Sequence, residues 1–490
     1  MFPNLSESLS LSLIGREILL VRVEIGIRKG LPLFQILGLA SQNTKESRDR
    51  LRLALESSEY AFPFATIIVN LHPNHRPKKV SFFDLAIALG ILEASGQWQN
   101  PSPGRIIALG SVSLSGQIHA SEELIELLWA CPKSDETIFL LPSDLKHRRL
   151  PEAKYVFLDS LKDLRHVEWK PETNAFQSPM EFEQIEAWDK EILSASQMLA
   201  FSGLCYSLLG RHHALMVGNP GTGKTKVAKL MAHLQPGWQK SDFDYYEGIP
   251  FSAKVSNSGK LKPRPFRQPH HTTTEQALVG GGSYLTLGEV SLAHGGILFL
   301  DEIALFREKA IESLREPMEE RKIEHARVLT RESLPADCIV IGALNPCPCG
   351  NYRGLKDCHC SKKQIRDYLK KLSGPFIDRI SIHIHLFAKD ENRIVEVFRE
   401  DYRNKLNEAM EFRMARSLEE SKIQNPKADL DLKNVNMERS LKKFSYRQKQ
   451  NTMQLARTIA DFNLSPIVKD QHLLEAYEFL QNSLFFEEIN

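Results

Sequence analysis

The sequence predicts an α/β multidomain protein whose core is a parallel β-sheet covered by helices. Its 490 residues suit two to four domains, at about 150 residues per domain. Hydrophobic residues make up 42% of the chain and charged residues 25%, a balance that supports buried cores of ordinary size. In the middle of the chain short apolar strands alternate with helical stretches, which is the pattern of a parallel sheet with helices on its faces.

The first region, residues 1–172, is expected to be a mixed α/β domain. Ile18–Ile27 alternates in hydrophobicity like a half-buried strand, whereas Asp84–Ser95 is apolar on all sides like a core helix. We expect further strands at Ala65–Leu71, Ile106–Leu114, Thr137–Leu141 and Lys154–Leu158, and a charged helix at Thr44–Ser57. The linker that ends this domain is expected between Pro151 and Pro179.

Two further regions follow. Residues 173–387 contain the strand-like segments HHALMVG, GGILFLDE, CIVIGALN and ISIHIHLF, separated by helical stretches. Residues 388–490 show no strand pattern, and their helical stretches are rich in Glu, Lys and Arg. We therefore expect them to form a small helical domain.

An eight-residue motif in the middle region fits G-x-x-x-x-G-K-[ST], directly after an apolar strand and before the helical stretch KVAKLMAHL. It consists of Gly218, Asn219, Pro220, Gly221, Thr222, Gly223, Lys224 and Thr225. In this context the glycines let backbone N–H groups point at phosphate oxygens at a helix N-terminus. Lys224 is expected to bind the β- and γ-phosphates of ATP, and Thr225 to ligate Mg²⁺. The alternative is a Gly-rich turn without a ligand.

A second motif, GGILFLDE, is an apolar strand that ends in two carboxylates. A strand buried on both faces carries Asp301 to the carboxyl edge of the sheet, where open α/β sheets bind ligands. Asp301 is expected to join Thr225 in holding Mg²⁺, and Glu302 to orient or deprotonate the attacking water. A solvated acidic pair is common at strand ends, but the P-loop upstream favours an ATP site.

Charge and composition narrow the function classes. Lys plus Arg (63) nearly equals Asp plus Glu (61), so a uniformly basic nucleic-acid-binding protein is excluded and any nucleic-acid surface is a local patch. No apolar run approaches the roughly 20 residues that span a bilayer, and the first residues lack the basic start and apolar core of a signal peptide. We therefore expect a cytoplasmic protein without a membrane partner.

Four of the seven cysteines are clustered, as Cys347-Pro-Cys349 and Cys358-His-Cys360. Clustered thiols in a reducing compartment bind metal more often than they form disulfides. Four thiolates within tetrahedral reach suit structural Zn²⁺, although a single residue between ligands is tighter than the usual spacing. The alternative is a loop with four reduced thiols.

With these motifs in order, the sequence resembles the magnesium-chelatase-like AAA+ ATPases, and within them the bacterial ComM/YifB competence-related group. The resemblance is carried by GLPLFQILGLASQNTKESRDRLRLAL, RPFRQPHHTTTEQALVGGG, GEVSLAHGGILFLDE, NPCPCG, SGPFIDRISIHI and ARTIADF. It implies an N-terminal domain similar to the Lon-protease (S5-like) fold, an AAA+ P-loop core and a C-terminal helical lid. It also implies that Asn345, at the end of the strand after the acidic motif, helps to position the water.

The resemblance assigns roles to arginines as well. Arg379, in the D-R-[ILF] element, is similar to the arginine finger that reaches a neighbouring subunit's γ-phosphate. Arg447, in the Ser-x-Arg element of a lid helix, resembles the lid sensor that touches nucleotide in the same subunit, and Arg457 is the competing candidate. A finger that acts on a neighbour requires a ring, which the family implies is a hexamer.

The chain departs from the family pattern at a few positions. Lys79-Val80 stands where a Glu-Gly step is usual, Ala86 replaces a proline, and His213 replaces an asparagine before the P-loop strand. Lon-type proteases use a serine activated by a lysine, and the position of that serine corresponds to Phe82, which is no nucleophile. We therefore expect the first domain to be a non-proteolytic binding or assembly module.

A local basic surface is expected between the P-loop helix and the acidic strand. The segment Lys254–His271 carries five Lys and Arg residues and no acid. Helicase-like AAA+ relatives place insertions here that face the central channel, where basic side chains can follow a phosphate backbone. Lys262, Arg264 and Arg267 are therefore the candidate DNA contacts, and the hairpin-like KIEHARVLTRESLP is a second candidate. The alternative for both is a solvated loop.

The expected function is that of a ring-forming, Mg²⁺-dependent ATPase that acts on single-stranded or branched DNA. By resemblance it is a branch-migration or helicase motor in natural transformation or recombination. One rival is a metal-chelatase motor subunit that drives Mg²⁺ insertion into a porphyrin, which the extra N-terminal domain and the cysteine cluster disfavour. Another is a non-enzymatic, ATP-binding assembly or regulatory factor, which Glu302 and Arg379 disfavour; a Lon-like protease is disfavoured by Phe82.

Overall fold

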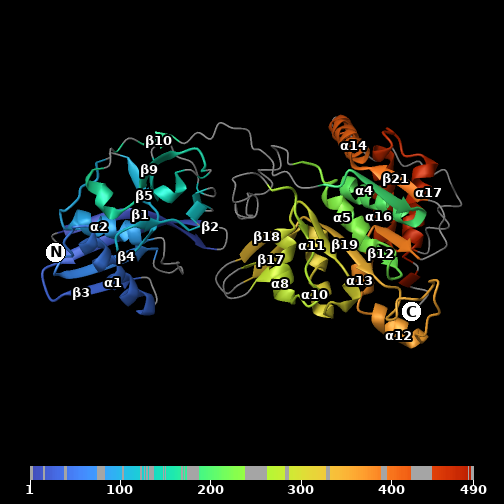
Figure 1. Cartoon of the computed structure of the whole chain (residues 1–490), viewed down its shortest axis with the longest axis horizontal. Coiled ribbons are helices and arrows are strands. Elements are labelled where there is room, and N and C mark those ends of the chain that lie inside the picture. Colours follow the sequence, from blue (N-terminus) through green and yellow to red (C-terminus); the bar gives the residue numbers. More distant parts are fainter. Residues whose placement is uncertain are drawn as a thin grey trace. The chain divides into compact units, whose positions relative to one another are not determined.

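A computed structural model describes residues 4–14, 17–37, 41–73, 83–101, 104–121, 124–125, 127–128, 131, 137–146, 148, 150–166, 169, 171–173, 187–237, 262–281, 286–326, 331–387, 394–420, 444–483 and 485–486. These residues form two compact units, both of which Figure 1 shows. The N-terminal unit holds the described residues up to 173. The C-terminal unit holds those from 187 on, except Lys262, which groups with the N-terminal unit.

Eight strands form a mixed sheet in the N-terminal unit, in the order β10-β9-β8-β5-β1-β2-β4-β3. β2 is antiparallel to both β1 and β4, whereas β1, β5, β8 and β9 are parallel neighbours. The strands are β1 (Asn4–Ile14), β2 (Glu17–Arg28), β3 (Leu33–Leu37), β4 (Thr66–His72), β5 (Arg105–Ala108), β8 (Thr137–Pro142), β9 (Lys154–Leu158) and β10 (Glu172–Thr173), with a small hairpin of β6 (Ser111–Val112) and β7 (Ile118–His119) and helices α1 (Ser41–Ser57) and α2 (Asp84–Ala94).

Most of the elements expected in this unit are confirmed, with two differences. The single strand expected over Ile106–Leu114 is divided into β5 and β6. The segment from Pro151, expected to contain the linker, holds a 3₁₀ turn (Leu161–Arg165) and β10 after the expected strand β9.

β1 is an element that the sequence analysis does not contain. Its Ser-Leu alternation places small hydroxyl side chains toward α2. Ser6 Oγ donates to the carbonyl oxygen of Gly90 and Ser8 Oγ to that of Ala86, each over 2.7 Å. The serine hydroxyls thus find hydrogen-bond partners where the strand packs closely on the helix, while Leu9 and Leu11 on the other face of the strand pack into a hydrophobic core.

The C-terminal unit is built on a five-stranded parallel sheet in the order β13-β16-β19-β12-β20. Its strands are β12 (Ala214–Gly218), β13 (Phe266–Arg267), β16 (Ile297–Leu300), β19 (Ile339–Leu344) and β20 (Ile382–Leu386). Alternate residues face two cores: Met216 and Ile341 belong to one, whereas Leu215 and Val340 belong to the other. Burial of both faces explains the continuous apolar runs and confirms the predicted parallel sheet with helices on its faces.

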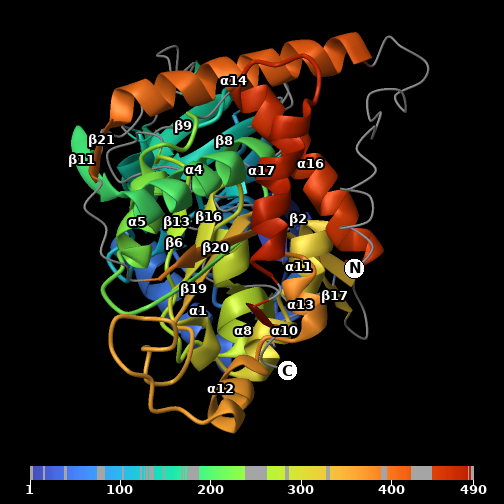
Figure 2. The ribbon, with the colours of Figure 1, turned by 90° about the vertical axis from the view of Figure 1, so that its right-hand side faces the viewer.

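Helices cover both faces of this sheet. The first core includes side chains of α4 (Ala195–Gly210), α5 (Lys224–Ala232), α14 (Arg399–Glu420), α16 (Tyr446–Phe462) and α17 (Asp470–Gln481). The second includes side chains of the short helices α8 (Glu275–Val279), α9 (Glu289–Leu292), α10 (Glu308–Glu312), α11 (Arg315–Glu320), α12 (Lys362–Leu369) and α13 (Gly374–Ile377). Figure 2 shows α16 and α17 side by side.

Strand pairs complete the C-terminal unit. β21 (Ile394–Phe398) pairs antiparallel with β11 (Lys190–Ser194), so the expectation of no strand in residues 388–490 is wrong at this point. The segment IVEVF is short, and Val397 is its only buried residue, which explains why its pattern is weak. The expected hairpin is confirmed as β17 (Lys322–Ala326) and β18 (Arg331–Pro335), and β14 (Gly280–Gly281) pairs with β15 (Thr286–Leu287). Of the helices that the structure describes, none is long and apolar enough to cross a membrane.

Candidate functional site

The P-loop lies at the carboxyl end of β12, between β19 and β20, where the strand order of the parallel sheet reverses. Ligand sites in open α/β sheets lie at this switch point. Gly218 must be glycine, because an added Cβ would lie 2.3 Å from the carbonyl oxygen of Leu386 in β20. Gly221 and Gly223 have φ angles of +80° and +87°, in the left-handed region that glycine adopts readily. The backbone is therefore folded tightly enough to serve as a phosphate cradle.

Lys224 is held by acceptors on both sides of the loop. Its Nζ donates to the carbonyl oxygens of Gly218 (2.6 Å) and Asn219 (2.9 Å), and to Oδ1 of Asn345 (3.2 Å). The structure thus brings the predicted lysine next to the predicted polar residue at the end of β19. Burial lowers the pKa of Lys224 to about 8, and the two carboxylates of the acidic motif offset part of this effect.

Thr225 and Asp301 meet at the position expected for magnesium. The Thr225 hydroxyl donates to Oδ2 of Asp301 over 2.9 Å. A hydroxyl and a carboxylate are hard oxygen ligands of the kind that Mg²⁺ prefers, so the donor set fits this ion. The exposed Glu302 follows with a φ of +49°, which is unusual for a residue other than glycine and typical of strained backbone at functional sites.

Gln197 contacts the loop and is not among the predicted residues. It belongs to a capping box at the start of α4, in which the Ser194 and Gln197 side chains each accept from the other's N–H group. Gln197 Nε2 also donates to the carbonyl oxygen of Thr222 over 3.0 Å, and an added Cβ at Gly223 would lie 2.5 Å from this nitrogen. The S-x-x-Q spacing can be read from the sequence as a cap, but its contact with the P-loop cannot.

Arg379 and Arg447, the predicted arginine finger and lid sensor, share one partner. Both guanidinium groups form ion pairs with Glu319 of α11. Arg379 also donates to the carbonyl oxygen of Pro375 over 2.7 Å, and its side chain is only 13% exposed. Glu319 is therefore a functional candidate that no sequence motif indicates.

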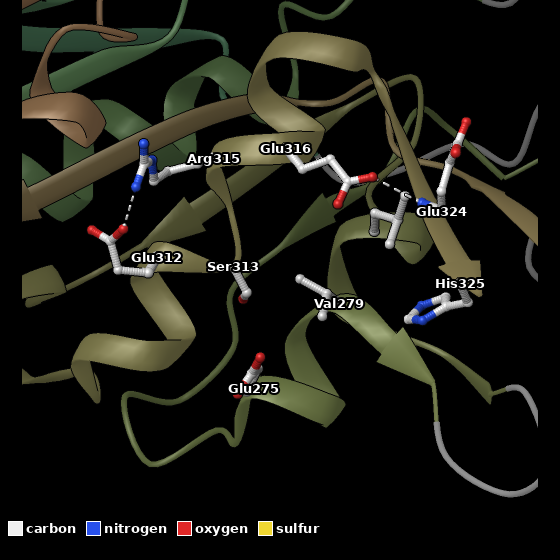
Figure 3. A pocket seen from close by; sticks show the side chains of 9 residues that line it. Glu275, Val279, Glu312, Ser313, Arg315, Glu316, Glu324 and His325 are labelled. Carbon is white, nitrogen blue, oxygen red and sulfur yellow. Dashed lines mark hydrogen bonds and ion pairs between the residues drawn. The ribbon is translucent and has the colours of Figure 1, made fainter. Parts of the chain in front are cut away.

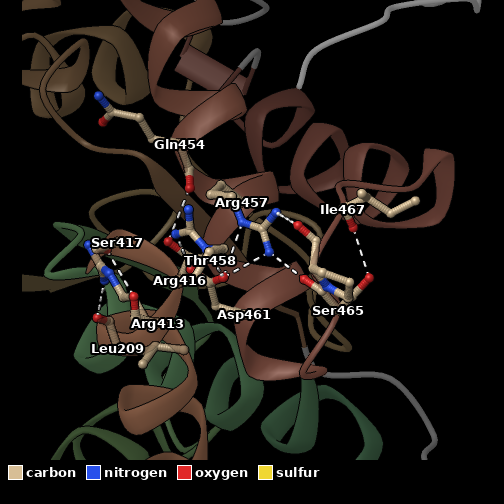
Figure 4. Close-up of polar contacts among 11 residues, drawn as sticks. Leu209, Arg413, Arg416, Ser417, Gln454, Arg457, Thr458, Asp461, Ser465 and Ile467 are labelled. Carbon is tan, nitrogen blue, oxygen red and sulfur yellow. Dashed lines mark hydrogen bonds and ion pairs between the residues drawn. The ribbon is translucent and has the colours of Figure 1, made fainter. Parts of the chain in front are cut away.

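Arg457, the competing sensor candidate, is bound among the C-terminal helices (Figure 4). It contacts the carboxylate of Asp461 over 2.8 Å and the carbonyl oxygen of Pro466 over 2.9 Å. Arg416 of α14 contacts the same carboxylate over 3.0 Å, and Asp461 is 1% exposed. These contacts bind Arg457 to its own helix and the segment after it, and which of the two arginines contacts nucleotide stays a prediction.

The four clustered cysteines have the geometry of a metal-ligand set. Their Sγ atoms all lie within 4.8 Å of one another, and Cys347, Cys349 and Cys358 are separated by 3.4, 3.6 and 3.7 Å. A tetrahedron of thiolates with Zn–S bonds of about 2.3 Å has edges of roughly 3.8 Å, so the three distances among Cys347, Cys349 and Cys358 are close to those of a zinc site, and Cys360 lies within 4.8 Å of them. Within the described ranges, no other group of three or more His, Cys, Asp or Glu residues has ligand atoms gathered in this way.

The predicted DNA-contact arginines have partners within the chain. Arg267 donates to both carboxylate oxygens of Glu289, each over 2.8 Å. Arg264 donates to the carbonyl oxygens of Pro236 (2.9 Å) and Gly295 (3.1 Å). Substitution of either arginine would therefore also disturb packing near β13 and β16, and contact with DNA stays a prediction. The rest of this segment before Lys262 lies outside the described residues, as do Lys79, Val80 and Phe82.

A separate pocket of about 380 Å³ lies between α8, α10, α11 and β17 (Figure 3). Its lining is acidic and contains none of the predicted site residues; it includes Glu275, Glu312, Arg315, Glu316, Glu324 and His325. Because carboxylates repel phosphates, this pocket is a poor nucleotide site. The P-loop remains the candidate site for a phosphate-bearing ligand.

A parallel sheet with a P-loop at its switch point and an acidic strand end beside it is the arrangement of a P-loop nucleotide-binding core, and the comparison with protein families narrows the class to Mg-chelatase-like AAA+. The family model described as "Magnesium chelatase, subunit ChlI" matches residues 194–394, which include the P-loop, the acidic motif, the cysteine cluster and Arg379. The model described as "Subunit ChlI of Mg-chelatase" matches residues 23–144.

Nearly the whole chain is similar to two bacterial proteins. "Competence protein ComM" of Haemophilus influenzae is 31% identical over 485 residues, which cover 94% of each chain. "Uncharacterized protein YifB" of Escherichia coli is 30% identical over 488 residues, with the same coverage. The chain therefore belongs to the ComM/YifB family, as its motifs predict. A shorter stretch of 173 residues, 35% of this chain and 22% of the relative, is 28% identical to "Probable DNA helicase MCM9" of Arabidopsis thaliana.

Proposed function

We propose that this protein is a Mg²⁺-dependent ATPase that assembles into a ring, a hexamer by family resemblance, and moves along single-stranded or branched DNA. One observation carries the proposal: the P-loop, the acidic strand and the neighbouring strand end place Thr225 against Asp301 and Lys224 against Asn345. These pairs are the parts that phosphoryl-transfer sites share.

Each residue of the site has a distinct task in this proposal. Lys224 exchanges its carbonyl partners for the β- and γ-phosphates, and Asn345 orients the attacking water. Glu302 accepts a proton from that water. Thr225 and Asp301 hold Mg²⁺, which neutralises charge on the phosphates.

Residues outside the P-loop complete the site by assembly. Arg379 of one protomer reaches the γ-phosphate held by its neighbour, and Arg447 contacts nucleotide in its own protomer.

The four cysteines hold structural Zn²⁺. The N-terminal unit is Lon-protease-like without proteolytic activity, the C-terminal helices form the AAA+ lid, and the protein works in the cytoplasm.

The DNA part of the proposal is supported by relatives and by local charge. ComM is named a competence protein and MCM9 a probable DNA helicase. Lys262, Arg264 and Arg267 are the proposed phosphate contacts. Because Arg267 is paired with Glu289, a DNA phosphate would have to compete with that carboxylate. Because the proposed contacts are with phosphates, DNA affinity should fall steeply as the salt concentration rises.

The test is ATP turnover in magnesium buffer without DNA, with single-stranded DNA, with a four-way junction, and with porphyrin plus chelatase partner subunits. We expect turnover that DNA stimulates and that Lys224→Ala abolishes. For DNA contact, Arg267→Gln is compared with Arg48→Gln, an exposed arginine of the N-terminal unit that pairs with Asp49. Only Arg267→Gln should weaken DNA affinity.

Other outcomes assign the protein differently. Stimulation by porphyrin and chelatase subunits but by no DNA indicates a chelatase motor, the activity for which the matching family model is named. Tight ATP binding without turnover indicates an assembly or regulatory factor. Failure to hydrolyse ATP at any protein concentration contradicts the ATPase itself.

A further inference from the structure

The P-loop and the loop that carries the four cysteines, residues 346–360, are joined through one side chain. Asn219 Nδ2 donates to the carbonyl oxygens of Gly350 (2.7 Å) and Tyr352 (3.2 Å). Asn219 is only 4% exposed, and a buried amide that loses such partners is costly. The position of this P-loop residue is therefore tied to the backbone of the cysteine loop.

Close steric contact reinforces these hydrogen bonds. Gly350 has a φ of +79°, and a Cβ added there would lie 2.6 Å from Cγ of Pro220, the next P-loop residue. A Cβ added at Gly354 would lie 2.7 Å from Asn219 Nδ2. The cysteine loop can approach the P-loop this closely only because it has glycine at these two points.

The two carbonyl groups that hold Asn219 are themselves positioned by a cysteine. The N–H group of Gly350 donates to the carbonyl oxygen of Cys347 over 3.0 Å, and that of Tyr352 donates to Cys347 Sγ over 3.4 Å. Fixing the Cys347 thiolate in a tetrahedral site would therefore fix both acceptors. Without a metal, the four thiols are free to separate.

Asn219 also reaches the phosphate-binding lysine. Its carbonyl oxygen accepts from Lys224 Nζ over 2.9 Å and from the Thr222 hydroxyl over 2.8 Å. The same residue thus contacts the cysteine loop through its side chain and the catalytic lysine through its main chain.

We propose that Asn219 is a positioning residue through which metal binding at the four cysteines sets the nucleotide affinity of the P-loop. The occupant is a tetrahedral, thiolate-preferring divalent ion, Zn²⁺. Zinc holds the Gly350 and Tyr352 carbonyls in place, these hold Asn219, and Asn219 keeps the loop in the shape that binds phosphates. The inference rests on the proposed function in one respect, since it takes the P-loop to be the nucleotide site.

The coupling must be reciprocal, because it is a free energy shared by two binding sites. We expect zinc-loaded protein to bind ADP about 5- to 100-fold more tightly than protein stripped of zinc and kept reduced, both measured by calorimetry in magnesium buffer. ADP should in turn raise zinc affinity by the same factor, measured by competition with a chromogenic chelator. The second measurement needs no ATP turnover.

Two variants test the route while leaving all four thiols in place. Asn219→Ala should retain zinc, bind ADP more weakly, and show the same ADP affinity with and without zinc. Gly350→Ala should do the same, because the new methyl group pushes against Pro220. Gly96→Ala is its matched control, since Gly96 also has positive φ (+73°) but open space around it.

The outcomes separate this inference from the proposed function. Equal ADP affinity in zinc-loaded and stripped wild-type protein overturns the coupling and leaves the ATPase intact. A protein that binds no zinc overturns the inference at its first step. A zinc-loaded protein that binds no nucleotide overturns the proposed function and the inference with it. Coupling that persists unchanged in Asn219→Ala rejects Asn219 as the route.

Discussion

Glu319 of α11 forms an ion pair with Arg379, the residue expected to act on a neighbouring protomer. The same carboxylate also holds Arg447 of α16. To reach the γ-phosphate of a neighbouring subunit, Arg379 has to break its ion pair with Glu319. Ring assembly would then exchange a carboxylate for the γ-phosphate of another protomer, and Arg447 would likewise have to exchange Glu319 for the nucleotide of its own protomer.

The first prediction concerns action across the subunit boundary. Arg379→Ala should lower ATP turnover by about 10³-fold or more while each protomer still binds nucleotide. Mixing Arg379→Ala with Lys224→Ala protomers should restore turnover above that of either variant alone, because some interfaces then combine an intact P-loop with an intact finger. No recovery in the mixture would mean that Arg379 acts within its own chain.

The second prediction concerns pH. Burial lowers the pKa of Lys224 to about 8, so its ammonium form is lost as pH rises through that value. Bound phosphates favour the cation, and nucleotide affinity should therefore fall by up to tenfold per pH unit above pH 8. Calorimetry in buffers of different ionisation enthalpy should detect proton uptake on ADP binding near pH 8.5. Lys224→Arg should show no uptake, because arginine stays protonated.

The third prediction separates the two lid arginines. Asp461 is buried and contacts both Arg416 and Arg457, so Asp461→Asn removes the negative charge that two partly buried cations share. It should lower the free energy of unfolding by about 3 kcal/mol, measured by denaturant titration. Arg457→Ala should likewise destabilise the protein without a specific loss of nucleotide affinity. Arg447→Ala should show the opposite pattern, and a stable Arg457→Ala variant that fails to bind ATP would reverse the assignment.

The fourth prediction concerns His213, which stands where relatives are expected to carry asparagine. Its Nδ1 accepts from the N–H of Val340 (3.0 Å), so Nε2 carries the proton that is donated to the carbonyl oxygen of Met318 (3.2 Å). Burial lowers the pKa of His213 to about 4. Between that value and 6.5 the unfolded chain binds more protons than the folded one, so stability falls as pH decreases through this window.

The change His213→Asn tests this account, because the asparagine side chain does not titrate and its oxygen can accept from the N–H of Val340 as Nδ1 does. As pH decreases from 6.5 to about 4, protonation of His213 in the unfolded chain should lower the free energy of unfolding of the wild type by up to about 1.4 kcal/mol per pH unit. The variant should lack this contribution. His212, whose pKa burial lowers to about 3, remains in both proteins and supplies the common background. Identical pH slopes would show that His213 is not protonated on unfolding.

The sequence predicts those parts of the protein that short, local patterns encode. The P-loop, the acidic motif and Asn345 each end a buried strand, and parallel strands place their ends at one edge, so their meeting follows from the pattern. The ion pair between Glu319 and Arg379 and the bond from Asn219 to Gly350 join residues that are distant in sequence, and no periodicity marks them. β1 escaped prediction for a different reason: the residues that face α2 are serines, which donate to backbone carbonyls of that helix, and only the opposite face, with Leu9 and Leu11, is apolar.

The C-terminal helices share a core with the sheet that carries the P-loop. Leu455 and Ile459 of α16 and Phe479 of α17 are buried in the same cluster as Ile384 of β20, and Gly203 of α4 lets Phe479 come within van der Waals contact. Swinging these helices away would expose that apolar surface to water, at a cost of about 25 cal/mol for each Å². We therefore expect the C-terminal helices to move together with the sheet when the P-loop is displaced.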